Sequence, residues 1–204
     1  MAQRIKMVKY LDSYHTSNLD IRPVDREQIR TIAEIMLDSY INSPEYEGET
    51  LEDTIKEISM VFRGYYGKFL TDASFLAYDE DGDMVSGLFV CEFKNEPTLT
   101  YLFTRKDSQG RGYASALIQT AQTALLNMGY RRIYLYVSIS NHAACQLYKK
   151  QDFVEIPFNT TPVDRALLQE VRERELNFIP IKDEDEIAKL IDPEMRIHRR
   201  KQPS

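Results

Sequence analysis

The residues best suited to chemistry in this sequence lie at positions 109–114, in the run Q-G-R-G-Y-A. Gly110 and Gly112 have no Cβ atom, so the backbone between them can turn sharply and approach a ligand closely. Arg111 adds a positive charge that can reach a phosphate group. The composition indicates an anion-binding turn, although an ordinary turn between a strand and a helix has the same residues.

The neighbouring segments place this turn at the beginning of a helix. Residues 99–104 before it have the composition of a strand, and apolar residues in 113–128 recur at three- and four-residue steps. The first N–H groups of a helix have no internal partner and lie at the positive end of its dipole. The turn is not a Walker A loop, because no Lys-Ser/Thr pair follows the glycine, and it lacks the G-x-G-x-x-G dinucleotide pattern.

A second strand and a short helix follow the first helix. Residues 132–138 predict a strand after a helix that Gly129 ends, so strand, turn, helix and strand form one right-handed crossover between parallel strands. Asn141 suits the N-cap of the next helix. The inner face of that helix carries Ala144, Leu147 and Tyr148.

Two of these segments resemble the GNAT superfamily of N-acyltransferases. Residues 109–114 fit the family signature Q/R-x-x-G-x-G/A, and residues 141–153, N-H-A-A-C-Q-L-Y-K-K-Q-D-F, resemble N-x-x-A-x-x-L-Y-x-x-x-G-F. Asp152 stands where the family usually has glycine. The resemblance implies an α/β, GNAT-like three-layer fold. Its mixed, mostly antiparallel sheet has helices on both faces and a splayed pair of parallel strands at the cofactor site.

The resemblance also implies a cofactor, acetyl-CoA (coenzyme A), and direct attack of a primary amine on its thioester. The turn would hold the pyrophosphate, and the strand before it would pair with the pantetheine arm. Asn141 would bind the arm from the other side or serve only as a helix cap. The residues expected to bind the cofactor are Leu102, Phe103, Thr104, Gln109, Gly110, Arg111, Gly112, Tyr113, Ala114, Asn141 and Ala144.

Tyr148 and Glu92 are the catalytic candidates. Tyr148 occupies the tyrosine position of the family motif, from which a phenol can donate a proton to the departing thiolate; the alternative is a packing tyrosine. A lysine-type amine, with a pKa of about 10.4, must lose a proton before it attacks. Thr98 stands where many family members have a glutamate, which leaves Glu92 on the preceding strand as a candidate base. Glu96, a water chain and His142 are alternatives, and an amine of low pKa needs no base.

The first two helices and their loops form the acceptor side in GNAT-like folds. Asp25 is expected to cap the first helix, and Thr50 with Asp53 predicts a capping box on the second. Nearby acidic residues at 45, 47 and 49 favour a cationic amine as acceptor. The expected substrate contacts, which could instead be half-buried packing residues, are Tyr40, Tyr46, Tyr65 and Tyr66.

The domain boundaries follow from the order of expected elements. Further strands are expected at 19–24, 73–78 and 84–93, joined to the strand that ends at 104. The acetyltransferase domain would span residues 19–181, after an N-terminal extension (1–18) that adds an edge strand or stays loose. A helix at 163–175 and a last strand at 177–181 would complete it, before a basic C-terminal tail (182–204).

Composition limits the class of protein. The chain has 204 residues, a net charge of −6 and two cysteines, without zinc-site spacing, a signal peptide or a membrane-length apolar run. We therefore expect a cytoplasmic N-acetyltransferase, monomer or homodimer, acting on a small amine or a protein amine. We expect no metal, nucleic-acid or membrane partner. The alternative is a coenzyme-A-binding sensor or regulatory module without turnover, which Thr98 and Asp152 favour.

Overall fold

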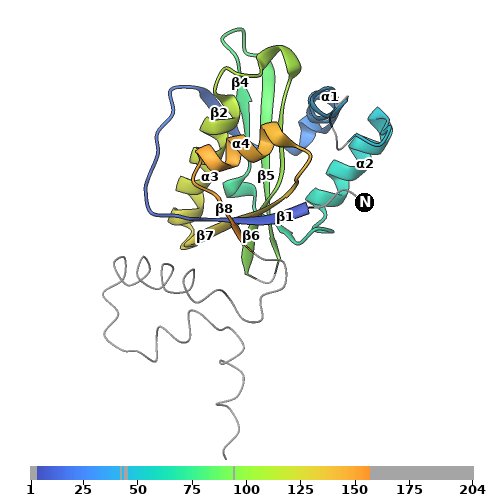
Figure 1. Cartoon of the computed structure of the whole chain (residues 1–204). Helices are drawn as coiled ribbons and strands as arrows, with labels where there is room; N and C mark the ends of the chain where they lie inside the picture. Colours follow the sequence, from blue (N-terminus) through green and yellow to red (C-terminus); the bar gives the residue numbers. More distant parts are fainter. Residues whose placement is uncertain (1–3, 42, 44–45, 94, 157–204) are drawn as a thin grey trace, which may run out of the picture. The chain divides into compact units, whose positions relative to one another are not determined.

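The computed structural model describes residues 4–41, 43, 46–93 and 95–156, and their strands form one eight-stranded sheet (Figure 1). The strands lie in the order β2-β4-β5-β6-β7-β1-β8, and β3 also pairs with β5. All neighbours are antiparallel except β6 and β7. The strands are β1 (Arg4–Tyr10), β2 (Asp20–Pro23), β3 (Lys68–Phe69), β4 (Phe75–Tyr78), β5 (Met84–Phe93), β6 (Glu96–Thr104), β7 (Arg132–Ser138) and β8 (Val154–Ile156).

Helices cover both faces of this sheet. The α-helices are α1 (Ile29–Tyr40), α2 (Leu51–Phe62), α3 (Tyr113–Asn127) and α4 (His142–Lys150). Short 3₁₀ turns lie at η1 (Arg26–Gln28), η2 (Thr71–Ala73) and η3 (Lys106–Ser108). Apolar residues of α1 and α2 form one core cluster with β4 and β5, whereas those of α3 and α4 belong to a second cluster. The predicted fold class, with a mostly antiparallel sheet, one parallel pair and helices on both faces, is confirmed.

The helix starts form as the sequence predicts. The Asp25 side chain accepts a hydrogen bond from the Glu27 N–H and caps η1, which leads directly into α1. Thr50 and Asp53 form a reciprocal capping box on α2. Asn141 Oδ1 accepts from the Ala144 N–H, 3.1 Å away, at the start of α4. These caps satisfy backbone donors that the first turn of a helix leaves without partners.

Residues 4–10 of the N-terminal extension form a strand inside the sheet rather than at its edge. β1 lies inside the sheet and pairs along its whole length with β7, from Arg4 opposite Ser138 to Tyr10 opposite Arg132. Its other edge pairs with β8. Met7 is fully buried, so this strand contributes to the core as well as to the ladder.

The expected helix at 163–175, the last strand at 177–181 and the C-terminal tail lie outside the described residues. Within the described part of the chain, none of the helices has the length and apolar character needed to cross a membrane.

Candidate active site

The two parallel strands separate soon after they meet. β6 and β7 pair only at Thr98 opposite Tyr134 and at Leu99 opposite Leu135. The β5–β6 register shifts at the next residue, so that Thr100 has no partner across the ladder. Such an irregularity bends a strand. From Thr100 onward, the edge of β6 that faces β7 is therefore not paired with that strand.

The predicted phosphate turn lies where β6 leads into α3. Gly110 (φ 76°) and Gly112 (φ 89°) both adopt left-handed backbone conformations, which glycine enters without steric cost. Gly112 is the N-cap of α3 and provides no side-chain cap, and a Cβ atom at either glycine would meet no atom within 4 Å. Open space in front of an uncapped helix start fits a pyrophosphate group.

Two side chains of α1 hold this turn in place. The Lys106 N–H donates to Asp38 Oδ2 (2.9 Å), and the Thr104 N–H donates to Ser39 Oγ (3.3 Å). Asp38 and Ser39 were not among the residues predicted from the sequence. The one indication in the sequence was that both are polar residues in the last turn of a helix.

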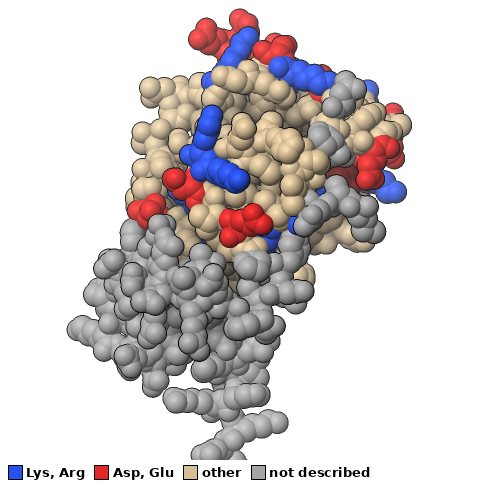
Figure 2. All heavy atoms as spheres, viewed as in Figure 1, with Lys and Arg blue, Asp and Glu red and all other residues tan. Residues whose placement is uncertain are grey.

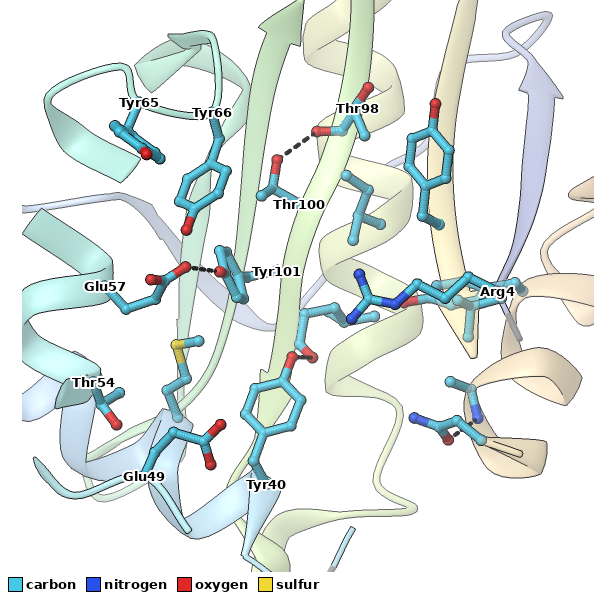
Figure 3. Close-up of a pocket in the computed structure, with 18 of the residues that line it drawn as sticks. Arg4, Tyr40, Glu49, Thr54, Glu57, Tyr65, Tyr66, Thr98, Thr100 and Tyr101 are labelled. Atoms are coloured by element: carbon cyan, nitrogen blue, oxygen red, sulfur yellow. Dashed lines mark hydrogen bonds between the residues drawn. The ribbon is translucent and has the colours of Figure 1, made fainter. Parts of the chain in front are cut away.

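A cavity of about 820 Å³ opens between the separated strands and α2 (Figure 3). It brings together seven of the predicted site residues: Tyr40, Tyr65, Tyr66, Leu102, Asn141, Ala144 and Tyr148. Tyr46, Glu92, Phe103, Thr104 and the turn at 109–114 do not line it. The cavity thus joins residues expected on the cofactor side with residues expected on the acceptor side.

Tyr148 reaches the cavity from α4. Its side chain is buried, and its ring packs edge-on against Phe153 at 5.7 Å between centroids. Asn141 and Ala144 line the cavity from the first turn of the same helix. Tyr40 approaches from α1, and its hydroxyl makes a long hydrogen bond (3.5 Å) to the Leu102 carbonyl of β6.

Glu92 points away from the cavity. Its neighbour on β5, Phe93, lines the cavity, and successive side chains of a strand point to opposite faces of the sheet. The Glu92 carboxylate accepts a hydrogen bond from the Tyr130 hydroxyl, 2.7 Å away, just beyond α3. Glu96 does line the cavity, but it pairs with Lys6 at 2.8 Å.

A cluster of two tyrosines around Glu57 on α2 was not among the features predicted from the sequence. The Tyr101 hydroxyl donates to Glu57 Oε1, and Figure 3 shows the Tyr66 hydroxyl directed toward the same carboxylate. Burial, followed by the hydrogen bond to Glu57 and its charge, raises the pKa of Tyr66 to about 12. The same causes raise the pKa of Tyr101. Both phenols therefore keep their protons to a higher pH than an ordinary tyrosine does.

Glu57 belongs to an acidic edge of the cavity. Glu49, Asp53 and Glu57 all line it and follow one another at four-residue intervals, which places the two helical residues on one face of α2. That spacing was the signal in the sequence that could have identified Glu57. Of the other predicted contacts, Tyr46 donates to the Glu49 carbonyl (3.3 Å), and Tyr65 packs edge-on against Tyr66.

Charges on the face seen in Figure 2 are mixed, with acidic and basic side chains interspersed over the described residues. Among the described residues, no group of three or more His, Cys, Asp or Glu side chains is placed to hold a metal ion.

Comparisons with known proteins agree on the family. The sequence model of the acetyltransferase (GNAT) family matches residues 31–153, which is more than half of the chain. No curated protein is significantly similar to this chain in sequence.

Solved structures share the fold. A GCN5-related N-acetyltransferase from Sphaerobacter thermophilus is 21% identical with a TM-score of 0.59; the match covers 74% of this chain and 48% of that one. This chain thus spans about half the length of that protein. The ribosomal-protein-S18-alanine N-acetyltransferase of Escherichia coli is 20% identical (TM-score 0.54, 67% and 78% covered). A PaiA N-acetyltransferase of Thermoplasma acidophilum, solved with coenzyme A, is also 20% identical (TM-score 0.51, 66% and 89% covered).

The family match, the separated parallel strands and the open glycine turn lead to one assignment. The chain belongs to the acetyltransferase (GNAT) family.

Proposed function

We propose that this protein is an N-acetyltransferase that joins the acetyl group of acetyl-CoA to a primary amine by direct attack on the thioester. The observation that supports this best is the single cavity shared by Tyr148 of α4 and the acidic, tyrosine-rich edge of α2. An acceptor amine held at that edge would face the donor across the gap between β6 and β7.

Residues of the turn and of β6 would position the donor. The N–H groups at the start of α3 would bind the pyrophosphate, with Arg111 adding charge from an exposed position. The edge of β6 beyond Thr100 would pair with the pantetheine arm. The donor supplies the reactive thioester, while the chain supplies orientation and charge.

Tyr148 would protonate the leaving group. As the new carbon–nitrogen bond forms and the carbon–sulfur bond breaks, the sulfur gains negative charge, which a phenol can neutralise by giving up its proton. Its buried position fixes the ring, so little conformational freedom is lost when the hydroxyl approaches the sulfur.

We assign to Glu57, directly or through water, the removal of the proton that the acceptor ammonium must lose before the neutral amine can attack. Glu57 and Glu96 both line the cavity, but Glu96 is already ion-paired with Lys6, whereas Glu57 has no Lys or Arg partner among the described residues. Glu92, a candidate base from the sequence, accepts a hydrogen bond from Tyr130 instead. Release of coenzyme A thiol should therefore fall about 10²-fold or more in Glu57→Gln and remain near wild type in Glu92→Gln. The reverse order would assign the role to Glu92.

One observation favours a second function, a sensor that binds coenzyme A without turnover. Thr98 lines the cavity at the position where many family members have a glutamate. Thiol release from acetyl-CoA, measured with a panel of primary amines, tests the two functions against each other. Amine-dependent release supports the transferase, whereas calorimetric binding of acetyl-CoA without release supports the sensor.

A further inference from the structure

A positively charged residue outside the range of the family match also lines the cavity. Arg4 is the first described residue, lies outside the matched residues 31–153, and lines the cavity from β1. Figure 3 shows its guanidinium group extending from β1 into the cavity, toward Tyr40. It is there because β1 pairs with β7, which sets Arg4 opposite Ser138 at the end of β7 that leads to Asn141.

Arg4 has no acidic partner within the described part of the chain. Other basic side chains do: Lys6, two residues along the same strand, pairs with Glu96, and Arg30 pairs with Glu34. Guanidinium groups bind carboxylates through two parallel hydrogen bonds, so an anionic group of a ligand is the natural partner for Arg4.

The cavity is therefore charged at both ends. Glu49, Asp53 and Glu57 line the side of α2, and none of them forms an ion pair with a Lys or Arg of the described residues. A purely cationic amine would be repelled by Arg4. A purely anionic ligand would be repelled by the three carboxylates. A molecule with both charges satisfies both sides.

We propose that the acceptor is a zwitterionic amine, a free amino acid or short peptide, whose carboxylate binds Arg4 while its amino group faces Glu57. This inference rests on the proposed N-acetyl transfer and adds the class of acceptor. Arg4 is then a specificity residue, supplied to the site by the N-terminal strand.

Binding in the presence of coenzyme A, whose free thiol has no acyl group to transfer, tests the inference without turnover. Calorimetry would compare free L-amino acids with their decarboxylated counterparts, such as L-lysine with cadaverine and L-phenylalanine with phenethylamine. We expect at least one amino acid to bind about tenfold or more tightly than its counterpart, because hydrogen bonds to charged groups contribute at least that much. Failure of every amino acid to bind, or equal binding of the counterparts, overturns the proposal.

Arg4→Gln should abolish the preference for an amino acid over its decarboxylated counterpart. Arg4→Lys should keep part of this preference, and Arg30→Gln should leave it intact. Arg30 is a matched control because it is exposed on α1 and does not line the cavity. Melting temperatures of the three variants establish that they fold. A preference that survives in folded Arg4→Gln removes Arg4 from acceptor recognition.

The acyl group is the other possible source of a carboxylate. Thiol release from succinyl-CoA and acetyl-CoA would be compared in wild type and Arg4→Gln. A change in acyl preference with no change in acceptor preference overturns the proposal. If no amine supports thiol release but amino-acid binding still depends on Arg4, the proposed transferase function fails and the zwitterion site stands.

Discussion

Asp152 and Lys9 form an ion pair, with 3.2 Å between Oδ2 and Nζ, that links the end of α4 to β1. Asp152 adopts a left-handed conformation (φ 60°), the conformation that glycine favours, at the position where the family usually has glycine. Asp152 thus departs from the family pattern in residue type but keeps the left-handed backbone conformation. It adds a contact to the strand that carries Arg4.

The two roles of Asp152 can be separated by substitution. Asp152→Asn removes the charge but tolerates the left-handed backbone, and since the Asp152 side chain is 83% exposed, we expect a loss of about 1 kcal/mol or less in the free energy of unfolding. Asp152→Ala should lose about 1 kcal/mol more, because alanine is strained at this φ. Urea unfolding measures both. An alanine variant as stable as the asparagine variant would contradict the backbone argument.

Gly112→Val should weaken coenzyme A binding by about tenfold or more. The side chain would fill the open space before α3 and keep the backbone from approaching the pyrophosphate. Gly82→Val is the matched control, since Gly82 (φ 84°) is equally left-handed and open but lies in the turn between β4 and β5. Calorimetric affinities that fall equally in both folded variants would show a general effect of strain.

Tyr148→Phe should slow acetyl transfer about 10²–10⁴-fold with little change in acetyl-CoA affinity. The hydroxyl matters only as the sulfur gains charge, so its loss affects the transition state more than binding. Single-turnover rates are the appropriate measurement, because slow product release would hide the effect in kcat. Tyr130→Phe, which removes a hydroxyl bonded to Glu92 outside the cavity, should react at the wild-type rate. A wild-type rate for Tyr148→Phe would leave Tyr148 as a packing residue.

Alkaline pH should destabilise the cluster around Glu57. Burial and Glu57 raise the pKa of Tyr66 from 10.0 to about 12, so above pH 10 the folded protein keeps a proton that the unfolded chain loses. The stability that this provides is complete below pH 10 and declines as the pH rises through about 12. Tyr101, whose pKa is raised for the same reasons, acts in the same direction.

Urea unfolding at several pH values above 10 measures this decline. The free energy of unfolding of the Tyr66→Phe, Tyr101→Phe double variant should fall less steeply with pH than that of the wild type. Parallel curves would mean that these phenols ionise as ordinary tyrosines.

Local sequence determined the helix caps and the glycine turn before α3. The capping box at Thr50, the cap at Asn141 and the turn at Gly110 and Gly112 depend on residues within a few positions of one another. Such contacts form within one turn of the chain, so the spacing of residue types is enough to predict them. The same holds for the motif that places Tyr148 on α4.

Tertiary structure decided what surrounds that motif. Glu57 became a cavity residue only because α2 lies against β6, where Tyr101 reaches its carboxylate. Glu92 does not line the cavity, because side chains alternate along β5 and Glu92 points to the opposite face of the sheet from Phe93. Which of the two faces it takes depends on which residues of β5 the core buries. Arg4 entered the cavity because β1 pairs with β7, more than a hundred residues away. The order of strands depends on the packing of the whole sheet, and no local pattern in residues 4–10 specifies a partner that distant.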